Sequence, residues 1–169
     1  MTPAISPTLS TLISAAMPVV EANEGRRLSV YRDTLGIPTI GIGFNLERAD
    51  ARKVLQELGV DYDALLNGNI SLTDNECDYL YRHVAIEVLE WLTSIFPDLA
   101  TYTVPRQIAL FDMGYNLGEK RFTNFRLMIA AVLAGDWHEA AKQALGSKWA
   151  KQVWKRALGD ARRLNEGEV

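Results

Sequence analysis

The stretch EGRRLSVYRDTLGIPTIGIG, residues 24–43, carries two carboxylates and a hydroxyl at short spacing. Glu24 closes an apolar segment with helical periodicity, Asp33 stands where a turn begins, and Thr39 lies in the strand-like segment that follows. An aspartate at the first turn position and a glycine at the last are typical of a type I turn. We therefore expect a hairpin that folds back toward a helix end and brings these three side chains to one cleft.

The segments on either side of this turn have their own signals. Periodic apolar residues predict a helix over 7–24 that begins at Ser6-Pro7, and Pro18 is expected to break or kink it. A strand over 37–44, with a short third strand near 44–46, completes a small antiparallel sheet. Its two glycines indicate a close backbone approach or a sharp bend.

Later helices have recognisable starting points. Thr73-Asp74-Asn75-Glu76 forms a capping box, and the apolar pattern after it predicts a long helix that ends before Pro97. Asp50 and Thr123 are further N-cap candidates. The very apolar run 125–133 is expected to lie at the centre of the core.

These elements predict an α+β fold that is mainly α, in one domain over 1–169. A small β-containing lobe spans about 25–70, and the helix at 73–95 connects it to a helical lobe over 96–169. The helix at 7–24 packs on that helical lobe. The chain is long enough to bury a sizeable core.

Composition narrows the class of protein. A formal net charge of -3 does not suggest a nucleic-acid binder. Cys77 is the only cysteine, which excludes an intrachain disulfide, and with only two histidines a zinc site is not expected. The N-terminal segment lacks the basic start and continuous apolar run of a signal peptide, so we expect synthesis in a cytoplasm.

The pair of carboxylates suits the hydrolysis of a glycosidic bond. That reaction needs an acid to protonate the leaving oxygen and a carboxylate on the other side of the sugar. Glu24 at the end of an apolar helix and Asp33 in a polar turn offer the two different environments that such chemistry requires. Taken singly, each of these residues is better explained by an ordinary structural role, namely a solvated helix end for Glu24, turn formation for Asp33 and β propensity for Thr39.

The surrounding residues decide between these interpretations, because together they resemble the catalytic motif of the phage-type (T4-like) lysozymes, glycoside hydrolases of family 24. The matching residues are Glu24-Gly25, Leu28, Tyr31, Asp33, Gly36 and Thr39-Ile40-Gly41-Ile42-Gly43. The resemblance continues to about Arg163, through Met113-Gly114-Tyr115-Asn116, Phe122-Thr123-Asn124 and Ser147-Lys148-Trp149. It implies a lysozyme-like fold with a cleft between two lobes and no metal or cofactor.

The resemblance also implies a reaction, the hydrolysis of the β-1,4 bond between N-acetylmuramic acid and N-acetylglucosamine in peptidoglycan. Glu24 is then the general acid, and Asp33 and Thr39 hold and activate the attacking water, which gives inversion at the anomeric carbon. Arg156 matches the family's arginine that pairs with the catalytic glutamate, although an ordinary surface arginine is the competing interpretation. The candidate sugar contacts are Asn45, Tyr115, Asn116 and Phe125, and core packing competes for the two aromatic ones.

The chain departs from the family at Phe44, where a histidine is usual. We expect this change to remove a stabilising ion pair rather than the chemistry. Phe125 also replaces a small hydroxyl residue that the family commonly has, which alters the shape of the site.

The implied biological role is that of a monomeric phage endolysin without a wall-anchoring module. It stays in the host cytoplasm until a separate holin gives it access to the periplasm and the cell wall. Weak contact of the basic segment 142–163 with membranes is a further expectation, and solvated helix faces explain this charge as well. The alternatives are a virion-associated wall-penetrating lysozyme and a non-catalytic glycan-binding protein. A lytic transglycosylase, which uses a lone acid, is disfavoured by Asp33.

Overall fold

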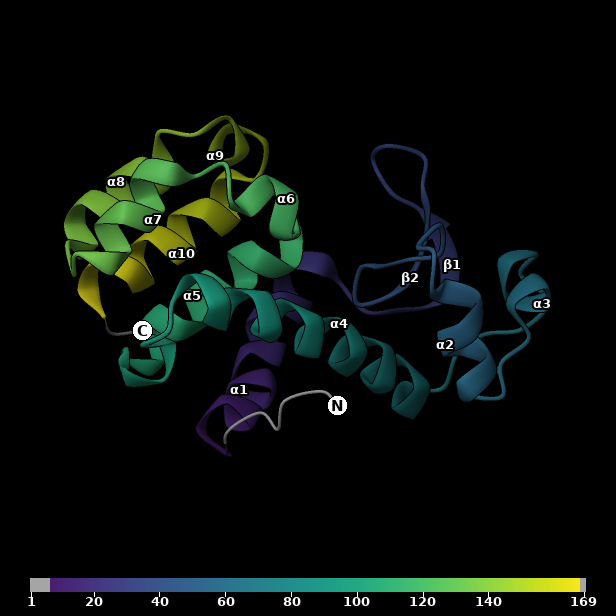
Figure 1. Ribbon diagram of the computed structural model, residues 1–169. Coiled ribbons are helices and arrows are strands. Elements are labelled where there is room, and N and C mark those ends of the chain that lie inside the picture. The colour runs from purple at the N-terminus through teal and green to yellow at the C-terminus, as the bar shows by residue number, and fades with distance from the viewer. Residues whose placement is uncertain (1–6, 168–169) are drawn as a thin grey trace. The chain divides into compact units, whose positions relative to one another are not determined.

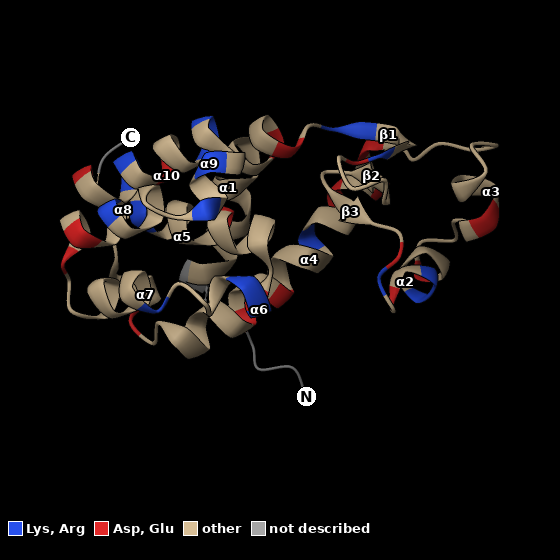
Figure 2. Cartoon of the chain, turned by 90° about the horizontal axis from the view of Figure 1, so that it is seen from above, with Lys and Arg blue, Asp and Glu red and all other residues tan. Residues whose placement is uncertain are grey.

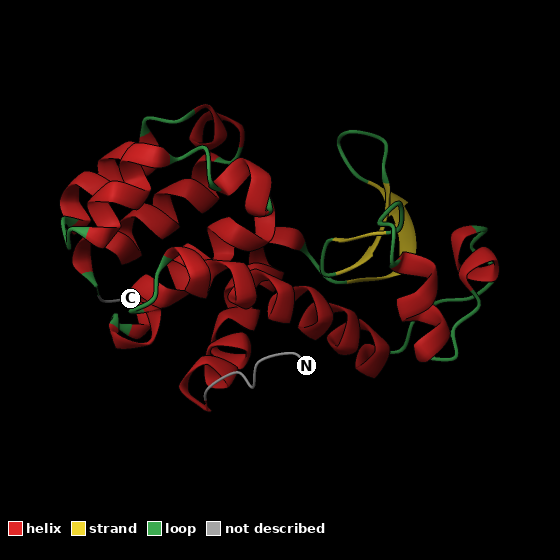
Figure 3. Cartoon of the chain, in the orientation of Figure 1, coloured by secondary structure: helices red, strands yellow, loops and turns green. Residues whose placement is uncertain are grey.

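Figure 1 shows the computed structural model, which describes residues 7–167. The described chain is mainly helical and contains a small antiparallel sheet, which confirms the predicted α+β class (Figure 3). It forms two compact units. Unit 2 holds Val20–Ala85, and unit 1 holds the residues up to Val19 together with those from Ile86 onward. The boundaries fall inside helix α1 (Pro7–Glu24) and helix α4 (Asp74–Ile95).

Unit 2 contains the sheet. Its strands run in the order β1-β2-β3, and each neighbouring pair is antiparallel. Helices α2 and α3 follow the strands, and the bounds are β1 (Arg27–Arg32), β2 (Pro38–Gly41), β3 (Phe44–Asn45), α2 (Ala51–Glu57) and α3 (Tyr62–Leu66). The third short strand is therefore confirmed. The predicted strand over 37–44 ends early, because Gly41 and Gly43 both adopt positive φ and turn the backbone.

The core of unit 2 lies between the sheet and α4. β2 is buried along its whole length, and Ile40, Phe44 and Leu46 are 0%, 1% and 1% exposed. The first turns of α4 bury Cys77, Leu80 and Tyr81. The capping box at the start of α4 is confirmed: Thr73 N–H donates to Glu76 Oε2 at 2.7 Å, and Glu76 N–H donates to Thr73 Oγ1 at 3.2 Å.

Unit 1 consists of helices and the loops between them, with no strand among its described residues. Its aromatic centre brings Trp91 and Phe122 to 5.1 Å between ring centroids, and Phe96 and Phe122 to 6.2 Å. Short loops join the helices, whose bounds are η1 (Leu99–Thr101), α5 (Val104–Leu117), α6 (Glu119–Phe122), α7 (Arg126–Leu133), α8 (Trp137–Leu145), α9 (Lys148–Gln152) and α10 (Trp154–Glu166).

Two of the predicted helix starts differ from the structure. Thr123 follows α6 as its C-cap and donates from Oγ1 to the carbonyl of Lys120 at 3.2 Å, so it does not begin α7. Asp50 stands at the N-cap of α2, but its side chain makes no capping bond, because Arg48 and His83 hold it. In both cases another hydrogen-bond partner holds the side chain that was expected to cap the helix.

Two further expectations differ from the structure. The predicted break at Pro18 is absent, since α1 continues through this residue, where proline removes a single backbone donor while apolar residues on both sides remain buried. The run 125–133 is not central to the core, because Leu127 and Leu133 are 67% and 56% exposed. An apolar composition did not reveal which face of this helix is covered. The expected cap at Ser6 lies outside the described residues.

Candidate active site

Glu24 is the last residue of α1 and is half-buried. Gly25 follows with φ +79°, and its N–H donates to the carbonyl of Glu21 at 2.8 Å, which closes the helix. The Glu24 side chain lies against the backbone of Gly43. A Cβ atom at Gly43 would stand 3.0 Å from Glu24 Oε2 and 3.2 Å from its Cδ. The motif glycine therefore leaves room for this carboxyl group.

Asp33 is held by the turn that it begins. Its Oδ1 accepts from the N–H of Leu35 at 2.8 Å and of Ile37 at 2.9 Å. The backbone closes the same turn, since Gly36 N–H donates to the Asp33 carbonyl at 2.9 Å. Both side-chain bonds use one oxygen, so Oδ2 is the atom that can take a further hydrogen bond within the described part of the chain.

Thr39 lies opposite Tyr31 of β1 and Asn45 of β3. Because Tyr31 and Thr39 pair directly across the β1–β2 ladder, their side chains leave the sheet on the same face. Thr39 is 4% exposed, and its hydroxyl donates to the carbonyl of Ile37 at 3.0 Å. Because its proton is used in this way, the hydroxyl can accept a hydrogen bond from a water but cannot donate one.

Tyr31 connects the two carboxylates electrostatically. Burial raises the pKa of its phenol first, and the negative charge of Glu24 and, more weakly, that of Asp33 raise it further. The guanidinium of Arg27 lies 4.6 Å from the ring centroid and acts in the opposite direction. The phenol therefore feels the fields of both carboxylates. Sequence analysis used Tyr31 only as a motif residue, although its place on the Thr39 face follows from the hairpin register.

Asn45, a predicted sugar contact, is half-buried in β3. Its Oδ1 accepts from the N–H of Glu47 at 2.7 Å, so the side-chain carbonyl holds the local turn. Neighbouring Phe44 is 1% exposed, and the Arg48 guanidinium lies 5.5 Å from its ring centroid. The residue that departs from the family pattern is thus a core residue of unit 2.

In unit 1, two of the predicted sugar contacts meet a tryptophan that sequence reasoning did not assign to the site. Asn116 Oδ1 accepts from Trp149 Nε1 at 2.8 Å, and the Phe125 ring lies edge-on to Trp149 with centroids 6.2 Å apart. Tyr115, next to Asn116, is half-buried, with its ring centroid 6.2 Å from that of Phe111. Trp149 therefore brings Asn116 and Phe125 together.

Phe125 and Trp149 also line a pocket of about 670 Å³ within unit 1. The charged residues in its lining are all cations, namely Arg121, Arg126 and Lys148. The pocket therefore suits an anionic ligand that has an apolar face. Phe125 is half-buried rather than enclosed, which leaves it accessible to such a ligand.

Arg156 forms a buried ion pair. Its Nε donates to Asp112 Oδ2 at 2.7 Å and its Nη2 to Asp112 Oδ1 at 2.8 Å, and both side chains are at most 5% exposed. Asp160, one turn further along α10, is fully buried. Burial, and then the neighbouring Asp112, raise the pKa of Asp160 well above its usual range. This pair of acids could not be predicted from the sequence, because Asp112 and Asp160 are far apart along the chain.

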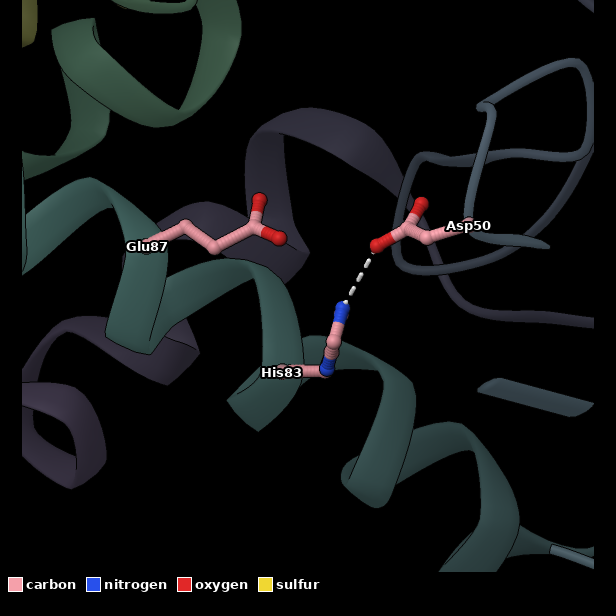
Figure 4. Close-up of side chains that lie close together, drawn as sticks. All are labelled: Asp50, His83 and Glu87. Atoms are coloured by element: carbon pink, nitrogen blue, oxygen red, sulfur yellow. Dashed lines mark hydrogen bonds and ion pairs between the residues drawn. The ribbon is translucent and has the colours of Figure 1, made fainter. Parts of the chain in front are cut away.

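The predicted absence of a metal remains a prediction. In unit 2, Asp50 and His83 are residue types that can bind a metal ion, and their side chains lie close together. Asp50 Oδ2 and His83 Nε2 are already engaged with each other in an ion pair at 2.9 Å. Arg48 donates to both oxygens of the same carboxylate at 2.9 Å. Arg48 and then His83 hold the pKa of Asp50 well below its usual range. Figure 4 shows this pair together with Glu87, which follows His83 by one turn of α4.

Comparison with known proteins places this chain in a family. The chain is 32% identical over 146 residues to the pre-baseplate central spike protein Gp5 of Enterobacteria phage T4, a match that covers 82% of this chain and 25% of that protein. It is 27% identical to probable T4-type lysozyme 2 of Dictyostelium discoideum, over 86% of this chain and 91% of the relative. Probable T4-type lysozyme 1 of the same organism is 25% identical, over 84% and 88%. The phage lysozyme family model matches residues 21–166, so the chain belongs to the phage lysozyme family.

Proposed function

We propose that the chain is a muramidase that hydrolyses the β-1,4 bond between N-acetylmuramic acid and N-acetylglucosamine in peptidoglycan. Family membership and the lysozyme relatives support a glycosidase of this class. The single observation that carries the assignment to residues is the placement of the Glu24 carboxyl against Gly43, with Tyr31 in the fields of both Glu24 and Asp33. A carboxyl at a helix end and a second one on the adjacent hairpin suit acid catalysis with an activated water.

Each side chain has a distinct part in the proposed mechanism. Glu24 protonates the leaving glycosidic oxygen. Asp33 accepts a proton of the attacking water through the oxygen that the turn leaves available, and the Thr39 hydroxyl accepts a hydrogen bond from that water. A water that attacks from the face opposite the leaving group gives inversion at the anomeric carbon. Asn45, Tyr115, Asn116 and Phe125 are proposed to contact the sugars.

The test is a turbidity assay on outer-membrane-permeabilised Gram-negative cells, with the released fragments identified by mass. The native protein should clear the cells and release reducing muropeptides, and Glu24→Gln should do neither. Glu57→Gln, which changes an exposed acid of α2, is the matched control and should be fully active. Equal clearing by native protein and Glu24→Gln would contradict the assignment of the acid. Wall binding without clearing by either would favour the non-catalytic glycan-binding alternative.

We further propose that the protein serves as an endolysin. In this role it is a monomer that remains in the host cytoplasm until a holin admits it to the periplasm. No helix in the described part of the chain is both long and apolar enough to cross a membrane. A virion-associated enzyme is the second candidate, since the T4 relative is a spike protein of which this chain matches a quarter. Presence of the chain in purified particles would favour the second candidate, and its restriction to lysing cells the first.

Contact with membranes is proposed for the exposed cations of α9 and α10, which Figure 2 marks in blue. Lys151, Lys155 and Arg162 are exposed there, beside Trp154 and Leu158, which are 54% and 40% exposed. A basic surface that also carries apolar side chains suits an anionic lipid interface. The native protein should co-sediment with vesicles of anionic lipid, whereas the double variant Lys151→Gln/Lys155→Gln should remain in the supernatant.

A further inference from the structure

Arg26, two residues after Glu24, is held by three carboxylates of unit 2. Its Nε and Nη2 donate to Glu21 Oε1 and Oε2 at 3.1 and 3.2 Å. Nη2 also donates to Asp78 Oδ1 at 2.7 Å, and Nη1 donates to Asp74 Oδ1 at 3.1 Å. The Arg26 side chain is 23% exposed, so the cluster is partly shielded from water.

The three acids come from two helices that meet next to the proposed acid. Glu21 lies in the last turn of α1, one turn before Glu24, whereas Asp74 and Asp78 lie in the first turns of α4. Arg26 itself occupies the link between α1 and β1. Because two parallel N–H···O bonds to one carboxylate restrict both distance and orientation, the guanidinium fixes this link with respect to both helices.

The link needs such a restraint because of Gly25. Its φ of +79° lies in the left-handed region, and a Cβ atom at this position would meet nothing within 4 Å. Glycine has no side chain to pack and loses more conformational freedom on folding than any other residue. Gly25 therefore cannot restrain the link by itself, and its neighbours must hold it. Any rotation about Gly25 changes the position of β1 relative to the end of α1, where Glu24 stands.

We infer that Arg26 is a positioning residue that clamps the last turn of α1 to the first turns of α4. The clamp keeps the Glu24 carboxyl against Gly43 for the hydrolysis proposed above, and its role rests on that proposed function. Arg26 does not contact the sugar in this account, because all three of its guanidinium nitrogens donate to protein carboxylates. Neighbouring Arg27 is exposed and lies over the Tyr31 ring, so it does not share this task.

The test compares Arg26→Met with Arg52→Met, each measured for kcat, KM and urea unfolding, with reducing ends released from peptidoglycan as the readout. Arg52 is the matched control, since it also pairs with one carboxylate through two bonds, to Asp63 at 3.0 and 2.7 Å, but lies on α2. Displacement of a catalytic group by about 1 Å lowers rates by up to about 100-fold. Arg26→Met should therefore lower kcat by about 10- to 100-fold with KM within about twofold, and Arg52→Met should change neither.

Further variants keep the inference testable if Arg26→Met does not fold. Arg26→Lys retains the charge but can pair with fewer oxygens, so it should recover part of kcat. Glu21→Gln/Asp78→Asn should lower kcat in the same direction as Arg26→Met. A kcat that stays within about twofold in folded Arg26→Met, or that falls only with the folded fraction, would overturn the clamp while leaving the muramidase assignment intact. Absence of reducing ends from the native protein would overturn both.

Discussion

The two units of this protein hold their functional groups by different physical means. In unit 2, Asp33 is held by backbone N–H groups two and four residues further along the chain, and Glu24 by a helix end and a motif glycine. In unit 1, Arg156 is held by an acid 44 residues away, in a buried cluster. Turn geometry therefore holds the proposed catalytic side chains of unit 2 in place, whereas buried charge pairs hold the side chains of the cluster in unit 1. Substitutions at the proposed site residues of unit 2 should affect rate more than stability, and substitutions in the buried cluster the reverse.

The largest expected effect on stability is that of Arg156→Met. Removal of this cation leaves the Asp112 carboxylate buried without its bidentate partner, a change that costs about 3–5 kcal/mol in the free energy of unfolding. Urea unfolding measures it. Arg52→Met removes an equally bidentate but exposed pair and should leave the unfolding midpoint nearly unchanged. Similar midpoints for the two variants would remove the distinction between the units.

Gly43→Ala should lower the rate by displacing Glu24. The added Cβ would meet the Glu24 carboxyl at 3.0 Å and displace it, so kcat should fall by about 10- to 100-fold. Gly59→Ala is the control, because Gly59 has φ +73° but open space around it. Both variants bear the left-handed strain of roughly 1–2 kcal/mol, and only Gly43→Ala should lose activity beyond its unfolded fraction. Equal activity would show that the close approach is irrelevant to catalysis.

Asp160→Asn should change how stability depends on pH. The folded protein keeps the Asp160 proton to higher pH than the unfolded chain, in which aspartate titrates near pH 3.9. The free energy of unfolding therefore falls as pH rises above about 4, by at most about 1.4 kcal/mol per pH unit, and stops falling above the folded pKa. The asparagine variant lacks this loss, so its advantage over the native protein should grow across that range.

Unfolding in urea between pH 4 and 8 measures this difference. As a carboxylate, Asp160 leaves its buried Oδ2 without a hydrogen-bond partner, whereas a protonated carboxyl group or an amide can donate to Asp112. Asp160→Leu removes the donor as well as the charge. Asp160→Leu should show the same pH dependence as Asp160→Asn but be less stable than Asp160→Asn at every pH. If the difference in free energy of unfolding between Asp160→Asn and the native protein stays constant with pH, the buried proton is contradicted.

The smallest effect concerns helix caps. Thr73→Ala removes the capping bond at the start of α4 and should cost about 1 kcal/mol in the free energy of unfolding. Thr123→Ala should cost much less, because Thr123 bonds a carbonyl at the end of α6 instead of capping α7. Thermal unfolding of the two variants side by side checks this. A larger loss for Thr123→Ala would mean that its bond to the Lys120 carbonyl matters more than a helix cap.

Short-range patterns were the part of the fold and site that could be predicted. The Asp33 turn, the third strand and the capping box at Thr73 all follow from residues within a few positions of one another. Backbone geometry and local hydrogen bonds determine such features, so the sequence is sufficient for them. The motif around Glu24, Asp33 and Thr39 belongs to this class and identified the family before the fold was known.

Features that depend on distant partners were decided only by the tertiary structure. Arg26 meets carboxylates 48 and 52 residues further along the chain, and Asp50 pairs with His83, 33 residues away, as well as with nearby Arg48. The same holds for the burial of Asp160 and for the exposed face of α7. Side chains with several possible partners take those that packing places nearby, because a buried charge without a partner is costly. A linear sequence records the side chains but not which of these partners will be within reach.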